Sequence, residues 1–182
     1  MKHKQSVVLA LLFLLCTATT CYEDDDRVDY PIALTGIKDL EHLDNTGDYP
    51  CLPTDGVVSR QAYMLKISLD FDYIEEFINE GYHYYVLKDT ITTVQIISLH
   101  SYDESHQAGT DVSGMFVDYP LSLGGQLKDY SRTIDGSIFY KVPLPGTLPQ
   151  AGVHKFKVVI KTTAGKEFTA ETDEITLEQR EE

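Results

Sequence analysis

The sequence predicts an all-β fold, an antiparallel β-sandwich with one short helix, and three observations support this prediction. Two segments, residues 63–71 and 153–162, alternate apolar and polar residues with the period of two that is typical of half-buried strands. Further short strand-like segments recur along the chain, separated by loops rich in proline and glycine. Helical and strand patterns do not alternate, which disfavours a nucleotide-binding α/β fold.

The chain begins with the pattern of a secretory signal peptide over residues 1–20. Lys2 and Lys4 precede an unbroken apolar run at residues 7–15, and a small polar stretch follows. The apolar run is too short to span a bilayer, which requires about 20 such residues. We therefore expect residues 1–20 to be removed, so that Cys21 becomes the first residue of the mature chain.

Cys21 has the surroundings of a lipidated cysteine. The small residues Ala18, Thr19 and Thr20 precede it, and this order resembles the lipobox of bacterial lipoproteins. Two or three acyl chains on one cysteine anchor a protein firmly, whereas a single chain binds only marginally. The acidic residues that follow make 21–29 a tether, and an acidic run at this place resembles the surface-export signal of Bacteroidetes lipoproteins.

A disulfide is the alternative fate of Cys21. If an ordinary signal peptidase cuts before it, the mature chain keeps Cys21 and Cys51, and two cysteines in an oxidising compartment can pair. Lipidation of Cys21 instead leaves Cys51 alone, and we then expect Cys51 to be a buried thiol. Cys-x-x-Cys spacings are absent from the sequence, so a structural zinc site is disfavoured.

The first predicted elements of the folded domain are two strands. One is expected within residues 28–45, around the apolar residues Ile32, Ala33 and Leu34. The second, at residues 63–71, places its odd-numbered apolar residues on the core, and Lys66, Ser68 and Asp70 on a solvent-exposed face.

A short helix is expected next, at residues 72–80, because apolar residues there recur at helical spacing and Gly81 stands where a C-terminal cap would be. Residues 82–87 form a short strand. Residues 92–99 form a strong strand with apolar residues on both faces, so we expect it in the centre of a sheet.

Two hairpins complete the predicted fold. Residues 130–142 carry an Asp-Gly turn at 135–136, which is typical of a two-residue hairpin loop. Residues 153–162 and 167–177 form the second hairpin. In the returning strand the residues expected to face the core change from even to odd numbers near residues 173–174. A β-bulge there would account for this shift of one residue.

Composition and charge limit the possible partners. The 182 residues include 15 Lys and Arg against 29 Asp and Glu, which gives a formal net charge of −14. An acidic chain is repelled by the phosphates of nucleic acid and cannot dock on anionic lipid through a basic patch. We therefore expect no nucleic-acid partner. One β-sandwich domain is expected over residues 30–178, with a frayed tail at 179–182.

Signatures of several common enzyme families are absent. The sequence has no G-x-S-x-G elbow, no H-E-x-x-H motif, no P-loop and no G-x-G-x-x-G. Its histidines are scattered. His100 and His106 lie six residues apart in a predicted loop without an evident third ligand, so metal ligation by histidine is disfavoured and we expect exposed loop histidines there.

A cluster of four acids at the predicted strand-to-helix junction suggests calcium. Asp70, Asp72, Glu75 and Glu76 could supply the several close oxygen ligands that a calcium site uses, although their spacing is not that of an EF-hand loop. The plainer interpretation, which we favour, is a set of acids at a helix N-terminus, where the helix dipole stabilises them. No cofactor other than this possible calcium is predicted.

Three tyrosines in one short segment are candidate ligand-binding residues. The chain has 12 tyrosines and no tryptophan, and Tyr82, Tyr84 and Tyr85 lie almost consecutively. Flat amphipathic rings can stack on a sugar or a protein partner. Tyrosine is also a good strand former, and this is the plainer reason for its presence.

Segments 62–67, 93–96, 108–113 and 154–157, together with Phe116, resemble a family of uncharacterised Bacteroidetes surface lipoproteins of about this size. The resemblance spans most of the mature chain and consists of strand patterns. It implies an immunoglobulin-like β-sandwich on the outer membrane and no assigned activity. It transfers no functional residue to this chain.

We therefore expect a non-catalytic, lipid-anchored protein that is exposed on the outer membrane of a Gram-negative bacterium and has a binding or assembly role. Its partner would be an envelope protein or a glycan, and its membrane contact would be the lipid on Cys21. The alternatives are a glycan-binding accessory lipoprotein and a hydrolase with a dispersed active site.

Overall fold

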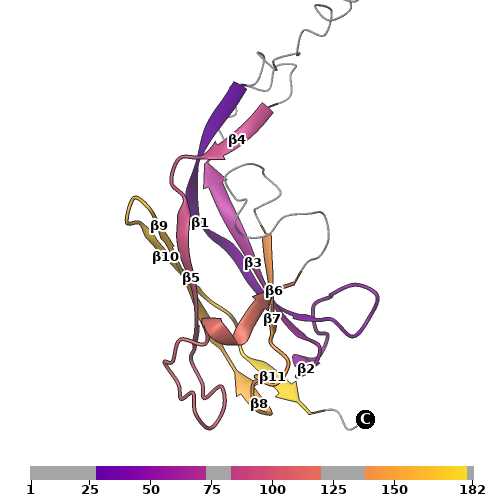
Figure 1. Cartoon of the computed structure of the whole chain (residues 1–182). Helices are drawn as coiled ribbons and strands as arrows, with labels where there is room; N and C mark the ends of the chain where they lie inside the picture. The colour runs from indigo at the N-terminus through magenta and orange to yellow at the C-terminus, as the bar shows by residue number, and fades with distance from the viewer. Residues whose placement is uncertain (1–27, 73–82, 120–137, 180–182) are drawn as a thin grey trace, which may run out of the picture.

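A computed structural model describes residues 28–72, 83–119 and 138–179, and within these ranges the protein is all-β (Figure 1). The only helical element there is a single 3-10 turn, η2, at Ser113–Met115. The predicted fold class, an antiparallel β-sandwich, is confirmed. The helix expected at residues 72–80 lies outside the described residues except for Asp72, which ends a strand. Within the described ranges, no helix has the length and apolarity that crossing a membrane requires.

The described residues form eleven strands. In chain order these are β1 (Val28–Asp44), β2 (Val57–Ser59), β3 (Tyr63–Asp72), β4 (His83–Leu87), β5 (Ile91–Ser98), β6 (Phe116–Asp118), β7 (Ile138–Pro143), β8 (Gly152–His154), β9 (Phe156–Thr162), β10 (Glu167–Glu171) and β11 (Ile175–Glu178).

Three sheets contain these strands. The large sheet has the order β4-β1-β3-β7-β6, the hairpin sheet has the order β10-β9-β5, and the small sheet has the order β2-β11-β8. Most neighbours are antiparallel, while β1 pairs with β4 and β2 pairs with β11 in parallel. In Figure 1 the hairpin sheet lies against the large sheet, and the small sheet closes one end of the molecule.

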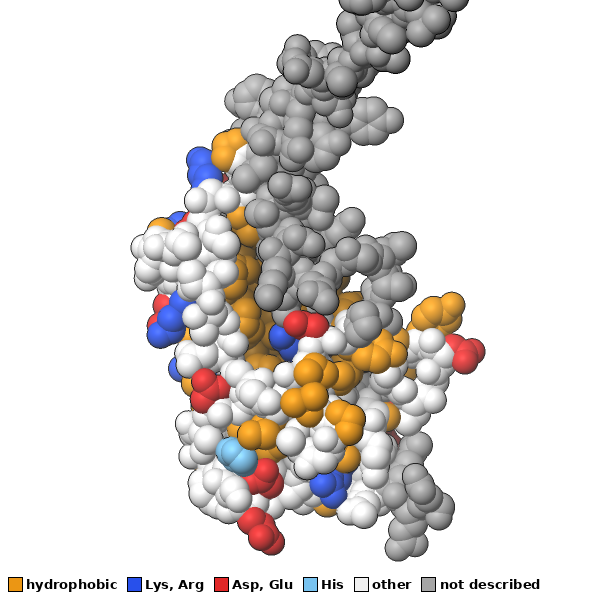
Figure 2. All heavy atoms as spheres, viewed as in Figure 1, with side chains coloured by type: hydrophobic (Ala, Val, Ile, Leu, Met, Phe, Trp, Pro, Cys, Tyr) orange, Lys and Arg blue, Asp and Glu red, His pale blue; other side chains and the backbone are white. Residues whose placement is uncertain are grey.

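The core lies between the large sheet and the hairpin sheet. Alternate residues of β3, from Tyr63 to Phe71, point into it, and so do Phe156, Val158 and Ile160 of β9. Figure 2 shows hydrophobic side chains along the seam between β5 and the large sheet. The period of two that predicted both strands is therefore confirmed on their core faces.

The face of β3 opposite the core is less exposed to solvent than the sequence predicted. Ser68, expected on the wet face, is only 5% exposed, and Met64 on the same face is fully buried. Only Asp70 is exposed as expected. β3 lies in the middle of the large sheet, and small Ser68 is flanked on this face by its cross-strand partners, Asp39 of β1 and Ile138 of β7.

The β5 strand is not central, contrary to expectation, but stands at the edge of the hairpin sheet. Its free edge is covered by segment 109–113, which hydrogen bonds to the backbone of the strand. The amide of Val112 donates to the Ile96 carbonyl at 2.8 Å, and the Ser98 amide donates to the Thr110 carbonyl at 3.0 Å. Covering an edge strand with a loop satisfies its backbone groups and prevents pairing with other chains.

The C-terminal hairpin is confirmed as β9 and β10, joined by a turn in which Gly165 has a φ of 77°. The predicted bulge near residues 173–174 is wrong. The returning chain breaks there and moves from the hairpin sheet to the small sheet as β11. Buried Thr172 stabilises the break, since its hydroxyl accepts the Phe156 amide at 3.0 Å and its own amide donates to the Phe156 carbonyl at 2.9 Å.

A buried carboxylate ties the turn of this hairpin to the connection between β4 and β5. Asp89 accepts hydrogen bonds from the hydroxyls of Thr162 at 2.6 Å and Thr163 at 2.7 Å, and from the amide of Ala164 at 2.6 Å. The Thr162 hydrogen bond, followed by the other two, lowers the pKa of Asp89 because each donor stabilises the ionised form.

The second strand of the other predicted hairpin is β7. It pairs with β3 on one side and with β6 on the other. Residues 130–137, which would hold the first strand and the Asp-Gly turn, lie outside the described residues.

Candidate functional site

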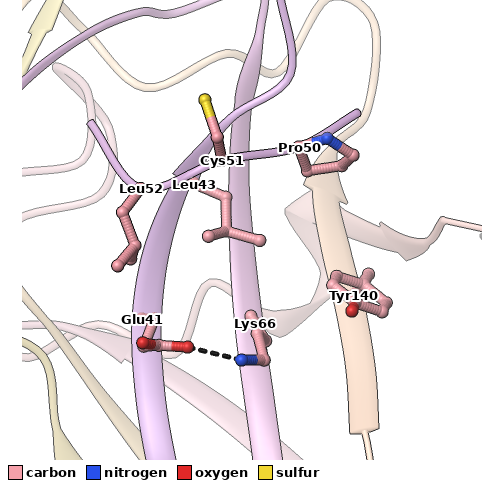
Figure 3. A pocket seen from close by; sticks show the side chains of 7 residues that line it. All are labelled: Glu41, Leu43, Pro50, Cys51, Leu52, Lys66 and Tyr140. Atoms are coloured by element: carbon pink, nitrogen blue, oxygen red, sulfur yellow. Dashed lines mark hydrogen bonds and ion pairs between the residues drawn. The ribbon is translucent and has the colours of Figure 1, made fainter. Parts of the chain in front are cut away.

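A hollow of about 260 Å³ opens on the outer face of the large sheet, the face opposite the core (Figure 3). We call it the Lys66 hollow. It is lined by Glu41, Leu43, Pro50, Cys51, Leu52, Lys66 and Tyr140.

The polar end of the Lys66 hollow is built by strand register. Glu41 of β1 is the cross-strand partner of Lys66 of β3, and Lys66 is the partner of Tyr140 of β7. Cross-strand partners project from the same face of a sheet about 4.5–5.5 Å apart at their Cβ atoms. Three adjacent strands therefore present a carboxylate, an ammonium and a phenol side by side.

Lys66 and Glu41 form an ion pair. The distance from Lys66 Nζ to Glu41 Oε2 is 2.6 Å, and the two side chains remain 24% and 32% exposed. The hydrogen bond to Glu41 raises the pKa of Lys66, with smaller contributions from the nearby Tyr140 and Asp39. Lys66 therefore stays charged at neutral pH, and the pair brings no net charge to the hollow.

The apolar end of the hollow is formed by the 45–56 loop, which crosses over Leu43. Two backbone hydrogen bonds close its first part, from the Asp44 amide to the Cys51 carbonyl at 2.8 Å and from the Cys51 amide to the Asp44 carbonyl at 3.0 Å. The Asp44 carboxylate also accepts the Thr46 amide at 2.9 Å. In Figure 3, Pro50, Cys51 and Leu52 lie on this side, and the ion pair lies at the opposite end.

Four exposed apolar side chains lie on the 45–56 loop or on the outer face of the large sheet, the face that holds this hollow. The described residues include five exposed large hydrophobic side chains, at Tyr49, Leu52, Val117, Ile138 and Val153. Tyr49 and Leu52, which are 82% and 58% exposed, belong to the 45–56 loop, and Figure 2 shows apolar atoms on this loop, at the right of the molecule. Val117 and Ile138 lie on the outer face, because their cross-strand partners Val142 and Ser68 share a face with Tyr140 and Lys66.

The residues that the sequence suggested for binding lie elsewhere or outside the described ranges. Cys21 and Tyr82 are outside those ranges. Tyr84 and Tyr85 lie in β4, where they pair with Asp29 and Tyr30 of β1.

The suggested calcium ligands are divided between described and undescribed segments. Asp70 and Asp72 are exposed residues of β3, whereas Glu75 and Glu76 lie outside the described residues. In the part of the chain that the structure describes, no group of three His, Cys, Asp or Glu side chains could hold a metal ion.

Cys51 is exposed and unpaired, not buried as expected. The reason is local, because its backbone pairs with Asp44 at the end of the large sheet and its side chain is left at the rim of the hollow. In Figure 3 its sulfur points away from the ion pair.

Two histidines of the predicted strand segments 28–45 and 153–162, His42 and His154, lie in the core. His42 is 7% exposed and His154 is fully buried. His42 hydrogen bonds through Nδ1 to the Tyr63 hydroxyl and through Nε2 to the Asp173 carbonyl, both at 2.9 Å. His154 Nε2 lies 2.7 Å from the Gln150 carbonyl. Burial lowers the pKa of both rings, because the charged form is poorly solvated there.

Two further histidines, His100 and His106, are partly exposed and each lies beside a carboxylate. His100 Nε2 is 3.3 Å from Glu174 and His106 Nδ1 is 2.8 Å from Asp103. These are surface contacts of the kind that contribute little to stability.

Sequence reasoning missed Glu41, Lys66 and Tyr140 because nothing local marks them. They are ordinary strand residues that meet only through the register of β1, β3 and β7. One signal was available, since Tyr49, Pro50 and Leu52 form an apolar group within an otherwise polar loop.

Comparison with known proteins gives a family and no function. The profile described as "Domain of unknown function (DUF5034)" matches residues 37–173, a range that includes every residue lining the Lys66 hollow. No curated protein matches the chain. A solved structure, the C-terminal domain of the Streptococcus agalactiae AgI/II polypeptide BspA, is similar at 8% sequence identity and a TM-score of 0.25, over 78% of this chain. The match covers half, 50%, of that solved chain.

Proposed function

The chain belongs to the DUF5034 family of domains of unknown function, and we propose that it is a non-catalytic binding protein of a Bacteroidetes-type outer membrane. Lipid on Cys21 anchors it at the cell surface, and its partner, an envelope protein or a glycan, occupies the Lys66 hollow. The observation that carries the binding role is the hollow itself, together with exposed apolar side chains on the loop that walls it and on the same outer face.

Exposure of these side chains has an energetic cost that binding would remove. Leaving a large apolar side chain in water forgoes about 1.5–3 kcal/mol relative to burying it. Single exposed apolar residues are common, but a group of them on one face is typical of an interaction surface. Tyr49 and Leu52 are held in such a group by a loop with its own backbone hydrogen bonds.

An anchor on Cys21 would leave only a short tether before the folded domain. The first strand begins at Val28, so the tether spans at most about 25 Å when fully extended, at roughly 3.6 Å per residue. A lipid on Cys21 would therefore hold the domain close to the membrane surface. The acidic tether and the acidic domain would be repelled by anionic lipid headgroups.

The anchor predicts that lipid is attached at one residue. We expect labelled palmitate to be incorporated into the wild-type protein and not into Cys21→Ser, while Cys51→Ser incorporates as much as the wild type. The N-terminal peptide of the mature protein should carry two or three acyl chains on Cys21, as read by mass spectrometry. A peptide map in which unmodified Cys21 is joined to Cys51 would rule out the anchor.

The binding role predicts that Cys51 is shielded in the native envelope. Cys51 is exposed and lies at the rim of the Lys66 hollow, so a bound partner should slow its reaction with a polar maleimide. We expect labelling on intact cells to be several-fold slower than labelling of the purified protein.

A matched variant distinguishes shielding by a bound partner from general shielding by the cell surface. Cys51→Ser combined with Ser105→Cys moves the single reporter thiol to an exposed position in another loop. This thiol should react at similar rates on cells and after purification. Equal slowing at both positions, or no slowing at Cys51, would remove the support for a partner at the hollow.

A further inference from the structure

We propose that the Lys66 hollow binds one pyranose ring of a glycan, through neighbouring hydroxyl groups that contact Lys66 and Glu41. This inference rests on the proposed binding function and names the chemical class of the ligand. Three features of the hollow carry it: unused hydrogen-bonding capacity at a neutral ion pair, an apolar wall opposite that pair, and a size suited to a single ring.

The ion pair retains both donors and acceptors for a ligand. The Lys66 ammonium has three N–H donors and the Glu41 carboxylate accepts about four hydrogen bonds, of which the pair itself uses one of each. Because the two side chains project side by side from adjacent strands, the unused groups face the same space. Two neighbouring sugar hydroxyls match this arrangement, since one can accept from the ammonium while the other donates to the carboxylate.

The partial burial of the pair favours such a ligand. At 24% and 32% exposure, both side chains are open to a ligand and already separated from most of the bulk water. Hydrogen bonds to charged groups in such surroundings are stronger than those made in full solvent.

The remaining walls match the C–H face of a sugar. Leu43, Pro50 and Leu52 form the apolar end of the hollow, and Tyr140 adds an aromatic ring to its lining. The volume of about 260 Å³ is smaller than that of sites for drug-sized ligands, about 300–1,000 Å³. The hollow therefore suits one ring, with the rest of the glycan in solvent.

Charge disfavours the other small ligands that this site could take. Glu41 neutralises Lys66, so a phosphate or a carboxylate gains little there, and the chain as a whole repels polyanions at a net charge of −14. A cationic side chain would be attracted by Glu41 and repelled by Lys66. An uncharged polyol uses both members of the pair without opposing either charge.

The test is saturation-transfer NMR on the full-length protein purified in detergent, with the methyl pyranosides of glucose, galactose, mannose and N-acetylglucosamine as probes. We expect at least one of them to receive saturation from the protein. Glu41→Gln and Lys66→Met should each weaken its binding by about tenfold or more, the loss expected when a charged hydrogen bond worth about 1.5–3 kcal/mol is removed.

A second cross-strand ion pair provides the matched control. Lys161 and Glu167 lie 3.2 Å apart on β9 and β10 and do not line the hollow, so Lys161→Met and Glu167→Gln should leave sugar binding unchanged. Thermal unfolding of each variant confirms that it is folded.

Two outcomes would overturn the inference. If none of the four pyranosides receives saturation from the folded protein, the hollow does not take a sugar, and shielding of Cys51 on cells would then assign it to a protein partner. If a pyranoside binds equally well to Glu41→Gln and Lys66→Met, the sugar occupies another surface. The proposed binding function has a separate test, because it fails if the labelling of Cys51 is not slower on cells than on the purified protein.

Discussion

Replacing Phe156 by alanine is expected to lower the free energy of unfolding by about 3–5 kcal/mol, a large part of the roughly 5–15 kcal/mol that stabilises a typical domain. Phe156 is fully buried between the large sheet and the hairpin sheet. Five ring centroids lie 5.9–6.4 Å from its own, those of His42, Tyr63, Tyr102, Phe116 and His154. The lost ring would leave a cavity that these neighbours, each held on its own strand or loop, cannot fill.

Urea unfolding followed by far-ultraviolet circular dichroism measures this loss. The control is Phe168→Ala on β10, because Phe168 belongs to the same hairpin but is only partly buried. We expect its cost to be clearly smaller. An equal cost at both positions would contradict the central role of Phe156 in the core.

Acidification from about pH 7.5 to about pH 5.5 is expected to destabilise the protein through its two buried histidines. Burial lowers the pKa of His42 and His154 in the folded state, so the unfolded chain, with a histidine pKa near 6.5, binds protons first as the pH falls. Stability is therefore complete above about pH 6.5 and decreases below it. The loss is about 1.4 kcal/mol for each unit of pKa difference, once the pH is below both values.

The surroundings of the two rings explain the direction. Protonated His154 would carry a second N–H at Nδ1, an atom that is buried and has no hydrogen-bond partner among the described residues. His100 and Arg60 lie near His154 and oppose its charge. The loss of solvation on burial is the largest effect on His42 and disfavours its charged form. Asp173 favours that form and His154 opposes it, but the effect of Asp173 is smaller than that of burial.

Thermal unfolding at the two pH values measures the effect, expected as a decrease in Tm of several degrees, since about 1 kcal/mol corresponds to roughly 2–4 °C in a domain of this size. His154→Asn, which cannot titrate, should reduce the decrease, and His106→Gln, a partly exposed histidine that does not act on either buried ring, should not. Most carboxylates stay ionised in this range, and their partial protonation would relieve repulsion in an acidic chain and raise Tm. A Tm that is unchanged or higher at the lower pH would therefore contradict the role of the histidines.

Strand positions were predictable because alternation is a local property. The alternating segments at residues 63–71 and 153–162 correspond to β3 and to β8 with β9. The turn between β9 and β10 was marked by Gly165, whose positive φ favours glycine.

Burial was less predictable, because alternation indicates which residues share a face but not what covers that face. Ser68 read as solvent-exposed and is buried, since β3 has a neighbour on each side. His154 lies in the segment 153–162 that alternation predicted as a strand, and its burial follows because it precedes Phe156 by two residues and its ring stacks on that of Phe156 in the core. Cys51 was predicted to be a buried thiol and is exposed. Its backbone pairs with Asp44, and this pairing leaves the side chain at the end of the sheet.

The sequence by itself determined the fold class, most strand positions and the C-terminal hairpin, all of which depend on residues close together in the chain. The tertiary structure alone decided the Lys66 hollow. Glu41, Lys66 and Tyr140 come from three separate strands, and they become neighbours only because β1, β3 and β7 pair in one register. Register is set by contacts between distant segments, and a slip of one residue would turn each side chain to the other face.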